Sequence, residues 1–554
     1  MTTDPDRAGP KPDRAGGPPR SSTQIDRTPG PRVDVCVVGA GPAGGLLAHR
    51  LAERGHDVTV LDAGPRFDMG ERARLDRMER TLRPGHAAPE VWEMGGARDA
   101  YSTGRRSYPL NHTRVKGVGG STLHWQGIVM RLHESDFERG SRGEGDADWP
   151  IDYADLRPYY AAAERGLGVA GGSDNPFAPP REEPFPLPAF PPSYSDALFA
   201  PACEELGITM HSVPGARNTE PYDGRPVCDG YGTRRPAGPA GGQYSGDVHV
   251  RKAEAAGARV VDRTPVQRLT VDRSGERATA AVYATPDGRE HRQEARQFVL
   301  AAGGVETPRL LLLSTSPEHP DGLANSSGLV GRHFMDHCFA GVGGRLDERT
   351  RQHHLGFNTR ESHQFYETDD PDVGAIKLEF LNYAGPSPLD RALSDGRWGD
   401  DLLDALRESY GSHVGVGALI EQPPRAENRV RLDPSRTDDH GNPVPRIEWS
   451  LGDRTRRTIE RANEIQRTIL DELGATIAWT VGPDSTGPAA HHMGTTRMGD
   501  DPATSVVDAR LRAHDLANLW VASSSVFPTG GAMNPTLTIA ALALMAAENV
   551  DEAL

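Results

Sequence analysis

Two adjacent histidines, His491 and His492, lie in the segment AAHHMGTTRMGDD at 489–501. An imidazole titrates at about pH 6.5, so it can accept a proton near neutral pH. Neighbouring residues on an extended backbone point to opposite sides. We therefore expect at most one of the two rings to face a given site, and the local residues leave open which one.

A second candidate group precedes a predicted helix, in the segment NPTLTIAALALMAAENV. Asn534 is a favourable N-cap, Pro535 suits the first turn, and residues 536–547 favour a helix. A helix N-terminus carries partial positive charge, which stabilises an anion placed there. Asn534 is thus expected either to cap this helix or to present its amide to a ligand.

The segment from Val33 has the strand, glycine turn, helix and strand order of a dinucleotide-binding unit. Its G-x-G-x-x-G glycines let a pyrophosphate approach the N-terminus of the following helix. The second strand, 57–61, leads into Asp62, which suits the ribose hydroxyls. The predicted contacts are Gly39, Ala40, Gly41, Pro42, Ala43, Gly44, Asp62 and Ala63.

Two later segments, 258–272 and 278–314, are predicted to form short strands that end in Ala302 and Gly303. Small residues there let a loop lie close to an adenosine, although an ordinary strand end explains them equally well. Flavoproteins of the glutathione-reductase type carry such a second segment, and simple NAD dehydrogenases usually lack it. We therefore predict FAD as the cofactor, with Val266, Ala302 and Gly303 beside it.

Chain length and composition set further limits. The 554 residues exceed what one compact core usually holds, so at least two domains are expected. Residues 1–32 are rich in Pro, Gly and Arg and are predicted to form a disordered tail. A net charge of −16 argues against nucleic-acid binding. The four cysteines show no metal spacing, so neither a disulfide framework nor a metal is predicted.

Neither a secretory signal nor a membrane span is expected. No run approaches the roughly 18 apolar residues of a transmembrane helix, and the first residues have no apolar core. We therefore expect a cytoplasmic protein.

Four motifs lie in a characteristic order: GVGGSTLHWQG at 117–127, AAGGVETPRLLLLS at 301–314, HHMGTTRMG at 491–499 and SSSVFPTGGAMNPTLTI at 523–539. With the glycine fingerprint, they make the chain resemble the glucose-methanol-choline (GMC) oxidoreductase family over nearly all residues after 32. The motifs are most similar to the branch of pyranose oxidases, gluconate and fructose dehydrogenases and glycoside 3-oxidases.

This resemblance implies an α/β fold with two domains. A Rossmann-like FAD-binding domain of glutathione-reductase type would be assembled from residues 33–165, 245–340 and 485–554. A substrate-binding domain with an antiparallel sheet would take residues 166–244 and 341–484.

The resemblance also assigns roles within the site. The family's His-x-x-Gly-Thr pattern selects His491 as the base that takes the alcohol proton, while hydride passes to flavin N5. Asn534 would assist at the substrate oxygen. His124 matches the histidine that carries the flavin covalently in pyranose oxidases, and a non-covalent contact is the alternative. Further flavin contacts would be Gly119, Gly120, Ser121, Thr122, Ser524, Pro535 and Thr536.

The implied activity is oxidation of a CH–OH group in a sugar, glycoside or polyol. The electron acceptor stays open between oxygen, a quinone and a redox protein, and so do the oligomeric state and partner subunits. The alternatives are a lyase that retains FAD and a non-catalytic flavin-binding protein. Asp336 and His337 match a family signature and are expected to hold the domains together. His353 and His354 are expected to be solvated.

Overall fold

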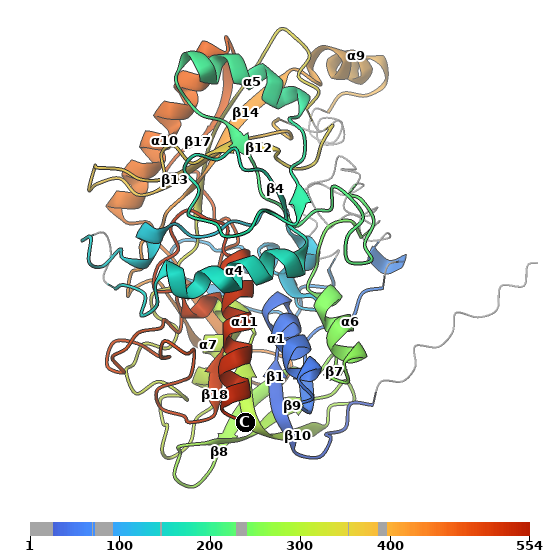
Figure 1. The fold of residues 1–554 in the computed structure, drawn as a ribbon, viewed down its shortest axis with the longest axis vertical. Helices are drawn as coiled ribbons and strands as arrows, with labels where there is room; N and C mark the ends of the chain where they lie inside the picture. The colour runs from blue at the N-terminus through green and yellow to red at the C-terminus, as the bar shows by residue number, and fades with distance from the viewer. Residues whose placement is uncertain are drawn as a thin grey trace, which may run out of the picture.

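The computed structural model describes residues 26–68, 70–72, 92–143, 147–228, 241–352, 354–385 and 396–554. Figure 1 shows an elongated molecule whose lower part contains both β1, from the start of the chain, and α11, from its end. The upper part is formed by segments from the middle of the chain. No helix in the described ranges is long and apolar enough to cross a membrane.

The lower part is built on a seven-stranded sheet in the order β7-β2-β1-β10-β9-β8, with β18 also paired to β10. The strands β1, β2, β7, β10 and β18 run parallel, while β8 and β9 form an antiparallel extension. The bounds are β1 Val33–Val38, β2 Val58–Leu61, β7 Arg259–Val261, β8 Val266–Val271, β9 Ala278–Ala284, β10 Glu290–Leu300 and β18 Leu519–Val521.

Helices cover this sheet because each presents an apolar surface. The helix α1 packs against α6 and α11, and α4 packs on α11. The helix α11 is buried along most of its length, as its run of Leu and Ala predicts. The bounds are α1 Pro42–Glu53, α4 Tyr153–Leu167, α6 Asp247–Ala255, α7 Gly303–Leu313 and α11 Thr536–Glu552.

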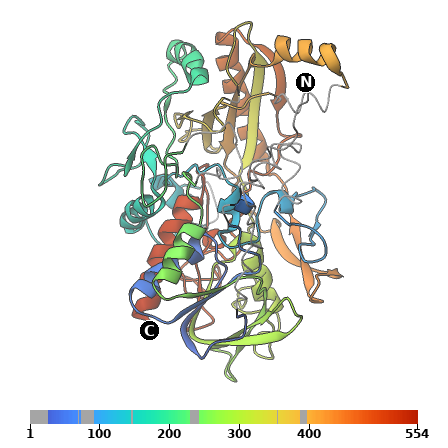
Figure 2. The same cartoon turned by 90° about the vertical axis from the view of Figure 1, so that its right-hand side faces the viewer.

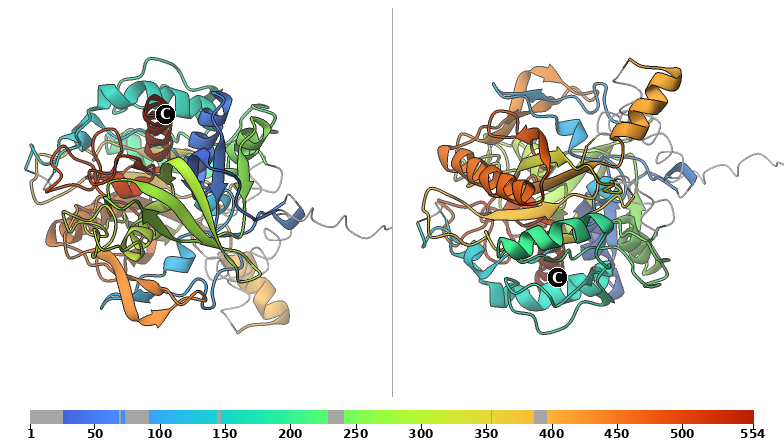
Figure 3. Two further views of the ribbon diagram at one scale, coloured as in Figure 1. Left: turned by 90° about the horizontal axis from the view of Figure 1, so that it is seen from below. Right: turned by 90° about the horizontal axis from the view of Figure 1, so that it is seen from above.

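The upper part contains a six-stranded antiparallel sheet in the order β17-β11-β14-β13-β12-β6. One face packs under α5 and α10, which lie side by side in the view from above (Figure 3). The bounds are β6 His211–Ser212, β11 Cys338–Arg345, β12 Arg360–Ser362, β13 Ile376–Phe380, β14 His413–Ile420, β17 Thr476–Val481, α5 Tyr194–Glu205 and α10 Asp453–Glu472. The predicted α/β two-domain fold is thus confirmed.

Short elements connect or flank the two parts. Figure 2 shows α9 (Gly399–Ser409) projecting from the upper part. The short strands are β4 Ala170–Gly171 and β5 Leu187–Pro188. The 3₁₀ turns are η1 Leu110–His112, η2 Gly120–His124, η3 Glu134–Phe137 and η4 Ser524–Val526.

The structure differs from the expected domain boundaries at two places. The strand β11 starts at Cys338, ahead of the expected boundary after 340, because the sheet needs its whole length for pairing with β14. The hairpin of β15 (Arg429–Thr437) and β16 (Pro443–Glu448) falls in the interval expected for the substrate domain. It instead packs on α7 of the lower part and pairs with β3 (Ser102–Thr103), as Figure 2 shows.

The end of the predicted disordered tail is ordered against the lower sheet. Arg27 donates to Asp262 Oδ1 at 2.6 Å, and Tyr283 donates its hydroxyl proton to the carbonyl of Arg27 at 2.7 Å. Residues 26–32 were predicted to be disordered. They are ordered because these hydrogen bonds attach them to the sheet. Residues 1–25 lie outside the described ranges.

Candidate active site

One cavity of about 870 Å³ extends between the two parts of the molecule. Its walls include Gly39 and Asp62 at the carboxyl ends of β1 and β2, and Trp479 on the six-stranded sheet. His491 and Asn534 line the same cavity. Residues separated by several hundred positions in the sequence are thus brought to one space.

The glycine fingerprint forms the nucleotide end of the cavity. Gly39 has φ +104°, and a Cβ there would lie 2.6 Å from the carbonyl oxygen of Ala301. A Cβ on Gly44 would lie 1.9 Å from the carbonyl oxygen of Gly39. Only glycine allows these approaches, so the turn keeps β1, α1 and the 301–303 loop in contact.

The groups at this end fit the diphosphate and the ribose of FAD. Gly41, Pro42 and Ala43 bring the N-terminus of α1 to the cavity, and its first turn contains no acidic residue. The first-turn N–H groups and the helix dipole therefore favour a diphosphate. Asp62, which was predicted to bind the ribose hydroxyls, accepts hydrogen bonds from the amides of Ala40 and Gly64 at 2.8 and 2.9 Å.

Most of the predicted cofactor contacts line the cavity. They are Gly39, Gly41, Pro42, Ala43, Asp62, Ala63, Gly120, Ser121, Thr122, His124, Val266, Ala302, Gly303, Ser524, Pro535 and Thr536. Ala40, Gly44 and Gly119 do not line the cavity and instead contact the residues that do. The amide of Gly119 donates to the carbonyl of Ala40 at 2.8 Å and so joins the two glycine loops.

The turn η2 carries the predicted attachment residue His124. Thr122 fixes this turn, because its hydroxyl donates to the carbonyl of Gly119 at 2.5 Å and accepts from the amide of Gly246 at 2.8 Å. Its hydroxyl is therefore committed to the protein rather than to a cofactor. His124 is largely buried, and its ring centroid lies 6.1 Å from that of Trp92.

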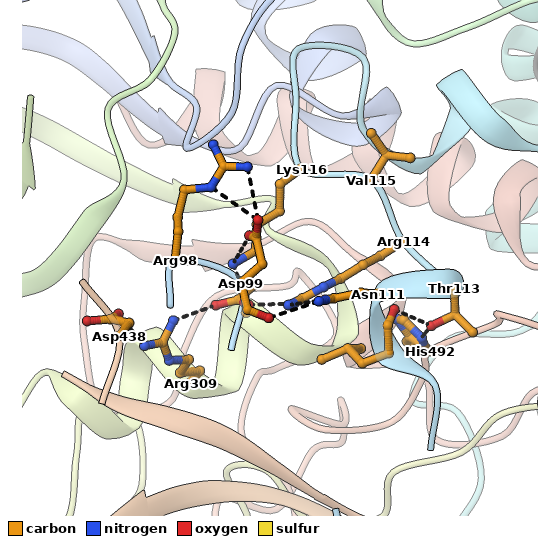
Figure 4. Close-up of polar contacts among 12 residues, drawn as sticks. Arg98, Asp99, Asn111, Thr113, Arg114, Val115, Lys116, Arg309, Asp438 and His492 are labelled. Carbon is orange, nitrogen blue, oxygen red and sulfur yellow. Dashed lines mark hydrogen bonds and ion pairs between the residues drawn. The ribbon is translucent and has the colours of Figure 1, made fainter. Parts of the chain in front are cut away.

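A chain of charges anchors the segment that leads to η2 (Figure 4). Asp99 is flanked by Arg98 at 2.9 Å and Lys116 at 3.4 Å. Lys116 also reaches Glu306 of α7 at 3.2 Å. These partly buried pairs link the 98–116 segment to α7, so the segment that leads to η2 is anchored.

The two adjacent histidines have different surroundings. Figure 4 shows His492 beside Thr113, whose hydroxyl lies 3.0 Å from His492 Nε2. The His492 ring also packs against Tyr108 and Phe334, and burial lowers its pKa to about 3. His491 instead places Nδ1 2.8 Å from His337 Nδ1 and Nε2 3.4 Å from Asn534 Nδ2.

Asn534 does not cap α11, which was one of the two roles expected for it from the sequence. The helix begins at Thr536, and no side chain caps its first turn. The Asn534 side-chain oxygen instead accepts a hydrogen bond from Lys377 Nζ at 2.8 Å. A buried ammonium needs acceptors, and this need takes precedence over the cap. The amide NH₂ is thereby turned toward His491.

Lys377 belongs to a buried charged group on the upper sheet. Its Nζ lies 2.8 Å from Glu379 Oε1 and 3.6 Å from Glu361 Oε2. Burial alone would lower the pKa of Lys377, but Glu379 and Glu361 raise it overall, so the ammonium is retained. A buried positive charge therefore stands directly behind Asn534.

Glu361 also lies beside His211 and His363, close enough for the three to hold a metal ion. The ring nitrogens are already engaged: His363 Nε2 is 3.1 Å from Glu361 Oε1, and His211 Nε2 accepts from the backbone amide of His363 at 3.1 Å. The ammonium of Lys377 already supplies a cation at Glu361. We therefore assign this cluster to hydrogen bonding.

Asp336 and His337, which were expected to hold the domains together, contact the loop that contains His491. Asp336 Oδ1 accepts from the backbone amides of Ala489 and His491 at 3.1 and 2.8 Å, and Oδ2 accepts from the hydroxyl of Tyr108. Burial raises the pKa of Asp336 to about 7. These two residues hold the histidine loop itself, because the chain turns into β11 directly beside it.

The cavity wall formed by the six-stranded sheet was not predicted. Gly343 and Gly417 lie on the sheet face opposite α10, with Trp479 and Phe339 lying across them: a Cβ at Gly343 would meet Trp479 at 2.2 Å, and one at Gly417 would meet Phe339 at 2.8 Å. Alternating glycines in CFAGVGGR and HVGVGALI were the available signal. That signal has meaning only once β11 is known to pair with β14.

His353 lies outside the described residues, and His354 is exposed, as expected. Cys36, Cys203, Cys228 and Cys338 are free thiols, so none forms a disulfide.

Comparisons with known proteins identify the family of the chain. Models described as GMC oxidoreductase match residues 90–339 and 424–543, and one described as FAD dependent oxidoreductase matches 34–96. The chain is 34% identical to the fructose dehydrogenase large subunit of Gluconobacter japonicus, over 93% of this chain and 97% of that protein. It is 31% identical to 2-methyl-1,2-propanediol dehydrogenase of Mycolicibacterium austroafricanum, over 96% of each chain.

A solved structure shares the fold. Pyridoxine 4-oxidase from Mesorbium loti matches with a TM-score of 0.63 and 21% identity, over 93% of this chain and 99% of that one. Fold, cofactor end and sequence similarity agree. The chain belongs to the GMC oxidoreductase family and is an FAD-dependent oxidoreductase.

Proposed function

We propose that this enzyme oxidises a CH–OH group of a sugar, glycoside or polyol, with His491 as the base and Asn534 as the donor to the same oxygen. The observation that carries this proposal is the pair formed by His491 Nε2 and Asn534 Nδ2, 3.4 Å apart at the cavity wall. An alcohol oxygen at this point can donate its proton to the imidazole and accept from the amide.

The cofactor and the residues around it have separate roles in this reaction. FAD, when bound, supplies the acceptor for the two electrons that leave the substrate carbon. The α1 N-terminus and Asp62 would hold its nucleotide half, and Ser121, His124 and Thr536 would hold its flavin half. His491 takes the hydroxyl proton, while Asn534 stabilises the negative charge that develops on the oxygen.

Two aromatic side chains on the cavity wall favour a ring-shaped, polyhydroxylated substrate. Trp479 and Phe339 present flat apolar faces, against which the C–H face of a sugar ring can pack. Gln126, Glu379 and Tyr383 line the same cavity and offer polar partners for hydroxyl groups. The similarity to a fructose dehydrogenase subunit favours the same class, while the similarity to a propanediol dehydrogenase keeps a small branched diol as the second candidate.

An anaerobic screen tests the proposal. Protein reconstituted with FAD is mixed with fructose, methyl glucosides, sorbitol and 2-methyl-1,2-propanediol, and loss of the oxidised-flavin absorbance is followed. We expect at least one sugar, glycoside or polyol to reduce the flavin faster than the diol. Reoxidation by oxygen, a quinone or a redox protein then identifies the acceptor. Product formation without flavin reduction would indicate a lyase, and no reduction at all would overturn the activity.

A further inference from the structure

His337 is fixed in one protonation pattern by the backbone. Its Nε2 lies 2.8 Å from the carbonyl oxygen of Gly531 and 3.2 Å from that of Gly530. A carbonyl oxygen can only accept, so Nε2 must carry the proton. His337 is fully buried, and burial lowers its pKa to about 4, so the ring is neutral and Nδ1 has a lone pair.

The protonation state of His337 determines which nitrogen of His491 carries a proton. The Nδ1 atoms of His337 and His491 are 2.8 Å apart, a distance at which one proton must lie between them. Because His337 Nδ1 has none, His491 Nδ1 is the donor. The remaining nitrogen of a neutral His491, Nε2, then carries the lone pair and points to Asn534.

We propose that His337 is a positioning residue that selects the tautomer of His491 in which Nε2 is unprotonated and ready to accept the substrate proton. This inference rests on the proposed role of His491. A solitary neutral imidazole populates both tautomers, and one of them presents N–H rather than a lone pair to the substrate. The chain from Gly531 through His337 removes that unproductive form before the substrate arrives.

The hydrogen bond between His491 and His337 also stabilises His491 after it has taken up a proton. When Nε2 takes the substrate proton, His491 becomes an imidazolium, and its Nδ1–H continues to donate to His337. The carbonyl dipoles of Gly530 and Gly531 lie behind His337, so the new charge is met by oriented acceptors that need not rearrange.

Substitutions at position 337 can distinguish the loss of the hydrogen-bond acceptor from the loss of side-chain volume. In His337→Asn, the side-chain oxygen occupies the place of Nδ1 and can accept from His491. In His337→Gln, the amide nitrogen occupies the place of Nε2, which retains the bond to Gly531 but not the acceptor. We expect the Asn variant to reduce its flavin within about tenfold of wild type, and the Gln and Leu variants to be slower by about 10²-fold or more.

A direct readout is ¹⁵N NMR of histidine-labelled, FAD-bound oxidised protein without substrate, with the His491 signals assigned by their loss in His491→Ala. We expect protonated Nδ1 and unprotonated Nε2 in wild type and His337→Asn, and a shift toward protonated Nε2 in His337→Leu. His249→Leu is the matched control, since His249 is also buried and bonded to Tyr244 but does not line the cavity.

The outcomes are separable. Protonated Nε2 in wild type, or an unchanged tautomer and rate in His337→Leu, would overturn the role of His337. Equal rates in His337→Asn and His337→Gln would also overturn it, even if His337→Leu does not fold. An undiminished rate in His491→Ala would instead overturn the proposed base and leave the measured tautomer coupling as a separate result.

Discussion

Lys377 Nζ donates a hydrogen bond to the side-chain oxygen of Asn534 over 2.8 Å. This contact decides which end of the amide faces His491, because the oxygen is taken by the ammonium and the NH₂ remains for the substrate. The ammonium also polarises the amide, which makes its N–H a stronger donor to a developing alkoxide. A strand of the upper sheet thereby orients the side chain that we propose as the donor to the substrate oxygen.

Replacing Lys377 by Met should therefore impair catalysis through Asn534. A hydrogen bond to a charged group is worth about 1.5–3 kcal/mol, which corresponds to a loss of about 10- to 100-fold in the rate of flavin reduction. The measurement is stopped-flow reduction in a double-mutant cycle with Asn534→Ala. In the Asn534→Ala background, Lys377→Met should cost much less. Fully additive losses would mean that Lys377 affects the rate independently of Asn534.

Gly343→Ala should damage substrate binding while sparing the cofactor. The new Cβ would lie 2.2 Å from the Trp479 ring, so the indole must leave its place on the sheet. We expect KM to rise by about tenfold or more, with unchanged FAD content, as one lost apolar contact predicts. Gly215→Ala is the control, because its Cβ would meet only the carbonyl oxygen of Gly127 at 3.5 Å. An unchanged KM would remove Trp479 from the substrate site.

The sequence predicts the parts of this site that depend on local geometry. Gly39 and Asp62 were identified because a strand, a turn and a helix within about 30 residues define their task. Lys377 was not identified, and His337 was expected only to hold the domains together, since their partners lie 157 and 154 residues away and no local pattern reports such contacts. For Asn534 the sequence left two roles open, and the structure excludes the cap because its side-chain oxygen accepts from a distant ammonium.

His124 offers a test of how FAD is held. If its ring carries the flavin, acid-precipitated protein should stay yellow, and His124→Ala should release all flavin on precipitation. The buried position of His124 on the cavity wall makes this geometry accessible. Complete release from wild type would establish a non-covalent contact. Trp125→Phe is a suitable control, since Trp125 bonds to the carbonyl of Tyr244 and should alter neither outcome.

Stability should fall in mild acid because several histidines are buried in the neutral form. Burial lowers the pKa of His492 to about 3 and that of His211 to about 4, against about 6.5 when unfolded. For a lowered histidine pKa, stability is complete above about pH 6.5 and is lost as the pH falls toward the folded pKa.

The measurement is the thermal midpoint at about pH 7.5 and about pH 5. His492→Phe keeps a ring between Tyr108 and Phe334 but cannot bind a proton, so its midpoint should fall less on acidification. The difference corresponds to about 2 kcal/mol for one such group. An equal fall in both proteins would show that His492 does not contribute to acid sensitivity.

The two neighbouring histidines provide the sharpest test of the site. Both histidines line the cavity, but His491 contacts His337 and Asn534, whereas the ring of His492 contacts Thr113, Tyr108 and Phe334. His491→Ala should slow flavin reduction by about 10²–10⁴-fold, the usual contribution of a general base, with FAD still bound by the distant glycine loop. His492→Ala should lower the thermal midpoint, because it opens a buried cavity, and should cost much less in rate. Stopped-flow reduction of both variants with the same alcohol, after equal FAD loading, makes the comparison. A larger rate loss in His492→Ala would place the base one residue later, and that result would contradict the hydrogen-bond geometry on which the proposed chemistry rests.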